Sequence, residues 1–220
     1  MTLEVINVET APNPTASIII LHGLGADGND FVPVAHELDL THVGPVRFVF
    51  PHGPTRPVTI NGGHVMRAWY DILGTDIERR EDEAGLRASQ ALVEALIAQE
   101  RARGIPASRI VLGGFSQGCA MTLMAGLRHS ERLAGLLGMS GYLPLADTTA
   151  AERSAANAGV PIFLAHGRSD PVIALARATA SRDALQALGY AVEWHDYPMP
   201  HSVCAQEIAD INRWLLKVLA

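Results

Sequence analysis

Short apolar segments alternate with helix-like segments along almost the whole chain. The candidate strands, rich in apolar and β-branched residues, are residues 17–21, 46–50, 109–113, 133–139, 161–165 and 190–194. The candidate helices are residues 31–38, 83–103, 117–128, 173–188 and 204–219. Strands that are apolar on both faces and separated by helices are typical of a parallel sheet covered on both sides. The sequence therefore predicts an α/β fold in one domain, residues 1–220, with a doubly wound, mostly parallel sheet and helices on both faces.

Composition limits the partners of such a domain. With 17 Lys and Arg against 23 Asp and Glu, the net charge is −6, which argues against nucleic acid or an anionic membrane surface as the main partner. The first residues lack a basic stretch followed by an apolar one, and no apolar run approaches the roughly 18 residues of a membrane span. We therefore expect a cytoplasmic protein without stable membrane insertion. Cys119 and Cys204 stand far apart in no metal-binding pattern, so reduced thiols and no metal site are expected.

One pentapeptide carries the strongest functional signal. Gly114-Phe115-Ser116-Gln117-Gly118 has the form G-x-S-x-G and stands between an apolar strand and a helix, which is the context that this motif needs. A serine on so sharp a turn has a strained backbone, and the two glycines leave room for it. The alternative is a tight turn without chemistry. The context favours Ser116 as a nucleophile exposed at the end of its strand.

A serine hydroxyl needs a base, and the base needs a carboxylate that orients it. In sheets of this kind the acid and then the base follow the serine, on loops after later strands. Asp170 follows the strand at residues 161–165, and His201 follows the last strand. Asp170 is also suited to cap the next helix, and Asp147 and Asp196 are weaker alternatives for the acid. Of the nine histidines, only His201 lies beyond Asp170 on a loop at a strand end.

Negative charge that develops on a substrate oxygen needs main-chain donors, an oxyanion hole. One expected donor is the N–H of Gln117, directly after the serine. The other is expected from residues 21–25, Leu-His-Gly-Leu-Gly, where glycine lets the main chain approach a ligand. The N–H of Leu24 is the favoured donor there, and Gly23 is expected to border the substrate. The alternative for this loop is a glycine-rich turn without a ligand.

Five motifs taken together resemble a known family. They are LHGLGAD at residues 21–27, PTRPVTINGG at 54–63, WYD at 69–71, GFSQG at 114–118 and YPM at 197–199. In this order they resemble the phospholipase/carboxylesterase family, which holds small bacterial carboxylesterases and eukaryotic acyl-protein thioesterases. The resemblance implies an α/β-hydrolase fold without a large cap domain. It also implies that Ser116, Asp170 and His201 form a catalytic triad.

The same resemblance implies an acyl groove bordered by the long irregular segment at residues 51–77. Trp69 is the residue of this segment expected to touch substrate, with a plain packing role as the alternative. A second irregular segment covers residues 140–159. The chain departs from the family pattern at Cys119 and Pro200, where glycine is usual. Both departures leave the catalytic groups in place and bear on substrate preference.

The activity implied by the resemblance is that of a serine carboxylesterase or thioesterase. It would hydrolyse short- to medium-chain acyl esters, acyl thioesters or lysophospholipids without a cofactor. Its partner would be a small-molecule acyl substrate. A homodimer is implied only by the family resemblance, since no feature of the sequence indicates one. Two alternatives stay open: a non-catalytic binding protein on a hydrolase scaffold, and a peptidase or dienelactone hydrolase on the same fold.

Overall fold

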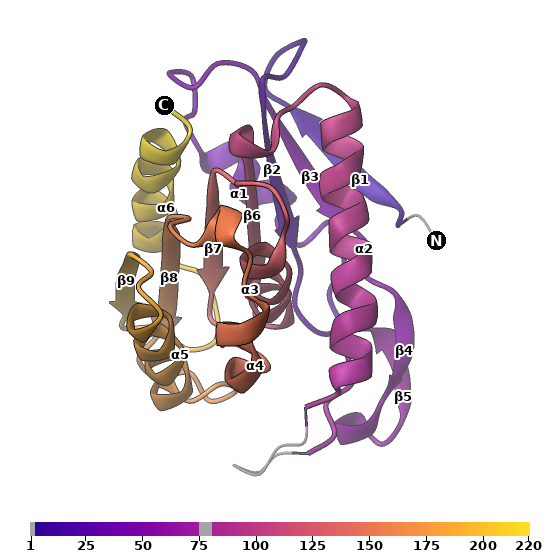
Figure 1. The fold of residues 1–220 in the computed structure, drawn as a ribbon. Helices are drawn as coiled ribbons and strands as arrows, with labels where there is room; N and C mark the ends of the chain where they lie inside the picture. Colours follow the sequence, from indigo (N-terminus) through magenta and orange to yellow (C-terminus); the bar gives the residue numbers. More distant parts are fainter. Residues whose placement is uncertain (1–2, 75–80) are drawn as a thin grey trace.

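A seven-stranded sheet forms the centre of the molecule (Figure 1). The computed structural model describes residues 3–74 and 81–220. The strands follow the order β1-β3-β2-β6-β7-β8-β9, and all neighbours are parallel except β1, which runs antiparallel to β3. The strands are β1 (Val5–Glu9), β2 (Ala16–Leu21), β3 (Val46–Pro51), β6 (Ile110–Phe115), β7 (Gly135–Met139), β8 (Ile162–Gly167) and β9 (Val192–Tyr197). The predicted mostly parallel sheet is confirmed.

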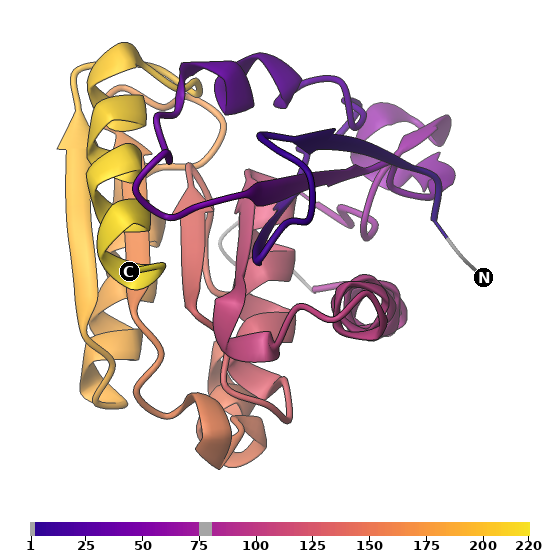
Figure 2. The same ribbon diagram turned by 90° about the horizontal axis from the view of Figure 1, so that it is seen from above.

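Helices cover both faces of this sheet, as predicted (Figure 2). They are α1 (Val32–Glu37), α2 (Glu83–Ala102), α3 (Gln117–Arg128), α4 (Ala146–Glu152), α5 (Leu175–Ala187) and α6 (Ala205–Val218). The pleat of β2 sends Ile19 into the core beneath α2 and α3, and Ile18 into the core beneath α1 and α6. A strand that is buried on both sides must be apolar throughout, which is why these strands were visible in the sequence.

Three short strands were not predicted. β1 alternates half-buried and exposed residues at the sheet edge, so it lacks a continuous apolar run. Within residues 51–77, β4 (Thr55–Val58) and β5 (His64–Arg67) form a separate antiparallel hairpin, where the sequence indicated irregular structure. Pro57 and the turn residues Gly62 and Gly63, both with positive φ, hide its strand signal. Residues 140–159, for which the sequence also indicates irregular structure, include α4 and a short 3-10 helix, Ala155–Asn157.

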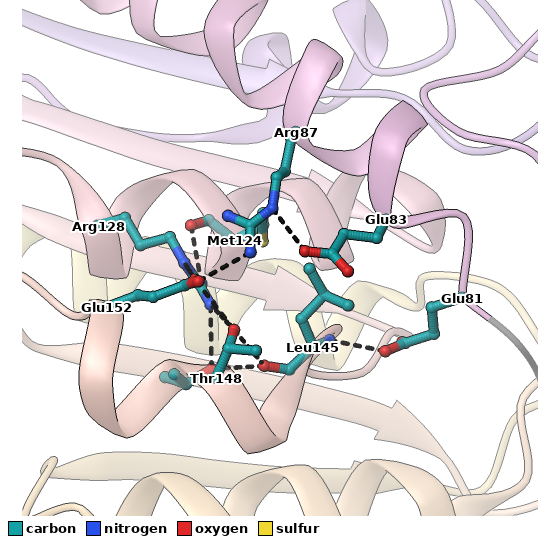
Figure 3. A network of polar contacts seen from close by, with 9 residues as sticks. Glu81, Glu83, Arg87, Met124, Arg128, Leu145, Thr148 and Glu152 are labelled. Carbon is teal, nitrogen blue, oxygen red and sulfur yellow. Dashed lines mark hydrogen bonds and ion pairs between the residues drawn. The ribbon is translucent and has the colours of Figure 1, made fainter.

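A polar network holds α4 against α2 and α3 (Figure 3). The Glu152 carboxylate accepts hydrogen bonds at 2.8 Å from both Arg87 and Arg128. The hydrogen bonds from these two arginines lower the pKa of Glu152 to about 2, and the bond from Arg87 has the larger effect. Glu81, just before α2, accepts from the Leu145 N–H at 2.8 Å. The loops after β7 are thereby fixed beside the start of α2. Within residues 3–74 and 81–220, no helix is long and apolar enough to cross a bilayer.

Candidate active site

Ser116 occupies a sharp turn between β6 and α3. Its backbone has φ 57° and ψ −116°, a conformation that non-glycine residues rarely adopt. A Cβ on Gly114 would lie 2.3 Å from the Gly118 carbonyl carbon, and one on Gly118 would lie 2.0 Å from the Leu21 carbonyl oxygen. Both glycines of the motif are therefore required sterically. The Ser116 N–H donates to the Met139 carbonyl at 2.9 Å, which ties the turn to the end of β7.

The structure brings Ser116, His201 and Asp170 into one hydrogen-bonded row. His201, on the loop between β9 and α6, places Nε2 at 3.0 Å from the Ser116 hydroxyl oxygen and Nδ1 at 2.6 Å from Asp170 Oδ2. Asp170 lies on the loop after β8, and its Oδ1 accepts from the N–H groups of Val172 and Ile173 at 2.8 and 2.9 Å. One oxygen of Asp170 thus holds its own loop while the other orients the imidazole.

The Asp170 carboxyl is buried but ionised. Burial by itself would raise its pKa, yet the hydrogen bonds from the Ile173 N–H, the His201 ring and the Val172 N–H together lower that pKa below the usual range. His166, also buried, donates from Nε2 to the Ile173 carbonyl at 2.8 Å and stands 3.4 Å from Asp170 Oδ2. A carboxylate facing Nδ1 favours the tautomer of His201 in which Nε2 accepts a proton from the serine.

The weaker alternatives for the acid and base lie elsewhere. Asp196 pairs with Arg168 at the surface, and Asp147 is exposed in the first turn of α4. The His195 ring stacks on Phe163. The structure places none of these three at Ser116.

The two residues expected to supply the oxyanion donors line the same cavity as Ser116. Leu24 and Gln117 both line it, and within the described part of the chain neither main-chain N–H has a hydrogen-bond acceptor. Gly23 is pressed against the serine, since a Cβ there would lie 3.3 Å from the Ser116 Cβ. Gln117 is the first residue of α3, where N–H groups are free of intrahelical bonds and favour negative charge. The arrangement can stabilise an oxygen anion beside Ser116.

The cavity has a volume of about 300 Å³ and is mainly apolar. Its lining residues are Gly23, Leu24, Ala26, Asp30, Tyr70, Ile72, Phe115, Ser116, Gln117, Tyr142, Val172, Ile173 and His201. Tyr70 and Tyr142 share a hydrogen bond of 2.8 Å between their hydroxyls within this wall. The sequence did not single out Tyr70, Ile72, Phe115 or Tyr142 for this wall. Three of them lie outside the helices and the sheet, where apolar residues carry no periodic signal, and Phe115 is the last residue of β6.

The expectation that Trp69 touches substrate is corrected by the structure. The Trp69 side chain is 0% exposed and is not among the cavity-lining residues. Its indole N–H donates to the His22 carbonyl at 2.9 Å. A buried indole needs such an acceptor, so the ring lies behind the loop of residues 21–25, and the next residue, Tyr70, faces the cavity instead.

The departures at Cys119 and Pro200 leave intact the hydrogen bonds that join Ser116, His201 and Asp170. Cys119 is buried behind the elbow, where burial raises the pKa of its thiol to about 12. This thiol therefore stays protonated and inert at neutral pH. Pro200 accepts from the Ser202 N–H at 2.9 Å in the loop that carries His201. In the part of the chain that the structure describes, no cluster of three or more His, Cys, Asp or Glu side chains could hold a metal ion.

The strand order and the serine elbow at the carboxyl edge of a parallel sheet define an α/β-hydrolase. No separate cap domain stands over the sheet among residues 3–74 and 81–220. A family model described as phospholipase/carboxylesterase matches residues 2–219. The chain belongs to this family and is therefore a hydrolase.

Curated relatives and solved structures agree with this placement. An acyl-protein thioesterase 1 from Yarrowia lipolytica is 40% identical over 206 residues, covering 91% of each chain. One from Neurospora crassa is 41% identical over 214 residues, covering 93% of this chain and 87% of the relative. The crystal structure of Zea mays acyl-protein thioesterase 2 superimposes with a TM-score of 0.88 at 29% identity, covering 99% of both chains.

Proposed function

We propose that this protein hydrolyses acyl esters and thioesters with Ser116 as its nucleophile. The observation that carries this proposal is the continuous row from Asp170 through His201 to Ser116. As the serine oxygen attacks the substrate carbonyl carbon, His201 Nε2 takes the hydroxyl proton. The carbonyl oxygen becomes an anion, which the N–H groups of Leu24 and Gln117 stabilise.

The tetrahedral intermediate collapses when the bond to the leaving group breaks. His201 gives its proton to the departing alcohol or thiol, and the acyl group stays on Ser116 as an ester. Water then attacks this acyl-enzyme while His201 takes one of its protons. The second intermediate releases the carboxylic acid and returns the proton to the Ser116 oxygen. Asp170 stays ionised throughout and stabilises the imidazolium of His201.

The cavity supports a short- to medium-chain acyl group as the preferred substrate. At about 30 Å³ per water-sized group, its 300 Å³ hold roughly ten non-hydrogen atoms. Branched and aromatic side chains form most of its wall, which suits a hydrocarbon chain. The thioester activity is supported by relatives named acyl-protein thioesterases, and a protein-bound or small-molecule thiol is then the leaving group.

We expect the activity to rise with acyl length only until the cavity is filled. Each methylene group buried in an apolar cavity contributes about 0.8 kcal/mol, which is roughly a fourfold gain in kcat/KM. Measured on p-nitrophenyl esters, kcat/KM should climb from acetate to about octanoate and then level off or fall towards palmitate. A continuous climb to palmitate would contradict this assignment of the cavity.

A paired assay separates the oxygen and sulfur leaving groups. Octanoyl and palmitoyl groups are each attached to the cysteine of one short peptide as a thioester and to the matching serine peptide as an ester. Release of free peptide is followed by chromatography, with the Ser116→Ala variant as the blank. Faster cleavage of the octanoyl thioester than of the palmitoyl thioester is expected. No cleavage of any of the four peptides or of the p-nitrophenyl esters would refute the proposed function.

A further inference from the structure

Trp69 lies buried between the two loops that carry the proposed oxyanion donors. Its indole N–H donates to the His22 carbonyl at 2.9 Å, and its main-chain N–H donates to the side-chain oxygen of Gln117 at 3.0 Å. The Trp69 carbonyl accepts from the Ser89 hydroxyl on α2. The side-chain nitrogen of Gln117 donates to the Tyr70 carbonyl at 2.9 Å. These bonds join the elbow, the loop after β2 and the segment before α2.

The groups that Trp69 anchors are adjacent to the donors themselves. His22 stands two residues before Leu24, and Gln117 supplies both the anchored side chain and the second donor. The His22 ring fixes the first loop again, because Nδ1 donates to the Gly23 carbonyl at 2.7 Å and Nε2 accepts from the Gly53 N–H at 2.8 Å. Burial lowers the pKa of His22 despite the opposing hydrogen bond to Gly23, so the ring is neutral, as this pattern requires.

The strand that leads to Trp69 holds the far end of the same loop. The Gly25 N–H donates to the Arg67 carbonyl at 2.9 Å, and Arg67 is the last residue of β5. Leu24 therefore sits between two anchored points, His22 and Gly25, that are both tied to residues 67–69. The elbow is tied to the same short segment through Gln117.

We infer that Trp69 and the Gln117 side chain are positioning residues that set the separation of the two oxyanion donors, the N–H groups of Leu24 and Gln117. The inference rests on the proposed function. An oxyanion hole is effective because its donors already stand where the charge will develop. A small displacement of either donor then weakens binding of the transition state more than binding of the substrate. Trp69 itself is not among the residues that line the cavity, so substrate affinity should be little changed.

The test uses Trp69→Phe, which removes the indole N–H, and Gln117→Met, which removes both side-chain bonds at nearly constant shape. Trp214→Phe is the matched control. Trp214 belongs to α6, is also buried, and packs against Phe163 on the other face of the sheet. Turnover of p-nitrophenyl octanoate gives kcat and KM, a trifluoromethyl ketone with an octyl chain gives a transition-state-analogue Ki, and thermal unfolding reports the fold.

We expect Trp69→Phe and Gln117→Met each to lower kcat by about 10- to 100-fold. This fall is no larger than the fall in kcat caused by removing one oxyanion donor completely. KM should stay within about twofold, and the Ki of the ketone should rise by the same factor as kcat falls. Trp214→Phe should keep both values. If Trp69→Phe does not fold, Gln117→Met decides the matter alone.

Three results would overturn the inference. They are a wild-type kcat in folded Trp69→Phe or Gln117→Met, a fall in kcat without a rise in the Ki of the ketone, or an equal fall in the kcat of Trp214→Phe. Failure of the proposed function itself would look different. The wild-type protein would then turn over no ester, whereas the inference on positioning can fail only in a protein whose wild type is active.

Discussion

Replacing Ser116 with alanine is expected to lower kcat/KM for p-nitrophenyl octanoate by about 10⁵-fold. The nucleophile is lost, while the cavity and the oxyanion donors remain to bind the substrate. The serine hydroxyl is small and the turn is held by its glycines and by the main-chain bond to Met139, so the fold should be kept. Stopped-flow or steady-state absorbance measures the rate, and circular dichroism checks the fold.

Ser116, His201 and Asp170, which are joined by hydrogen bonds, should act as one catalytic unit. His201→Ala added to Ser116→Ala is expected to cause no further loss, because a base has no function without its nucleophile. Ser169→Ala is the matched control, since this serine is exposed on the loop of Asp170. It should retain wild-type kinetics. Turnover by Ser116→Ala within about tenfold of the wild type would remove Ser116 from the mechanism.

The second large effect concerns Glu207, a buried acid on α6 behind the loop of His201. Its side chain is 0% exposed, and neither oxygen makes a hydrogen bond of normal geometry within the described residues. Its pKa is raised to about 8, mainly by burial; an interaction with the Cys204 N–H opposes this rise and the charge of Asp210 adds to it. Asp210 itself is paired with Arg213 and accepts from the Tyr197 hydroxyl at 2.8 Å. Glu207 is therefore mainly protonated at neutral pH.

A raised pKa in the folded state makes stability fall as pH rises. Between pH 4.5, the ordinary value for Glu, and about pH 8, the unfolded chain ionises at this residue while the folded chain keeps its proton. The free energy of unfolding loses about 4 kcal/mol across this window from Glu207 alone. Below pH 4.5 both states are protonated and no loss occurs; above about pH 8 both are ionised and the loss is complete.

Glu207→Gln is expected to remove this slope. The amide has nearly the same shape but does not titrate, so any cost of burying its N–H groups is the same at every pH. Urea unfolding at several pH values from 5 to 8 should show the variant gaining about 4 kcal/mol relative to the wild type between the two ends. Glu152→Gln is the control, because the pKa of Glu152 is lowered to about 2 and its charge is constant over this range. Equal slopes in wild type and Glu207→Gln would contradict a protonated Glu207.

The fold was predictable where burial is two-sided. The segments that form β2, β3, β6, β7 and β8 are apolar on both faces. Such a continuous apolar run can be recognised in the sequence without knowing which strands pair with it. The edge strand β1 and the hairpin β4–β5 are half exposed, and Pro57 interrupts the second, so their strand character depends on pairing that the sequence does not display.

The site was predictable where its residues follow strand ends in a fixed order, which is how Ser116, Asp170 and His201 could be chosen and then found side by side. Their catalytic roles stay predictions. Trp69 and Tyr70 show the limit, because two adjacent aromatic residues in a loop give no indication of which one faces a cavity. Glu207 shows another, since an acid three residues into a helix indicates an exposed N-terminal turn, and only tertiary packing buries it.

Ser116 as an activated nucleophile is tested most directly by covalent labelling with a fluorophosphonate, followed by intact-mass and peptide mass spectrometry. A fluorophosphonate phosphonylates only a serine that a base has activated beside an oxyanion hole. We expect one adduct per chain, on the peptide that contains Ser116, and none in Ser116→Ala. No adduct on the wild-type protein, or an adduct that persists in Ser116→Ala, would contradict this role of Ser116 and favour a binding protein on a hydrolase scaffold.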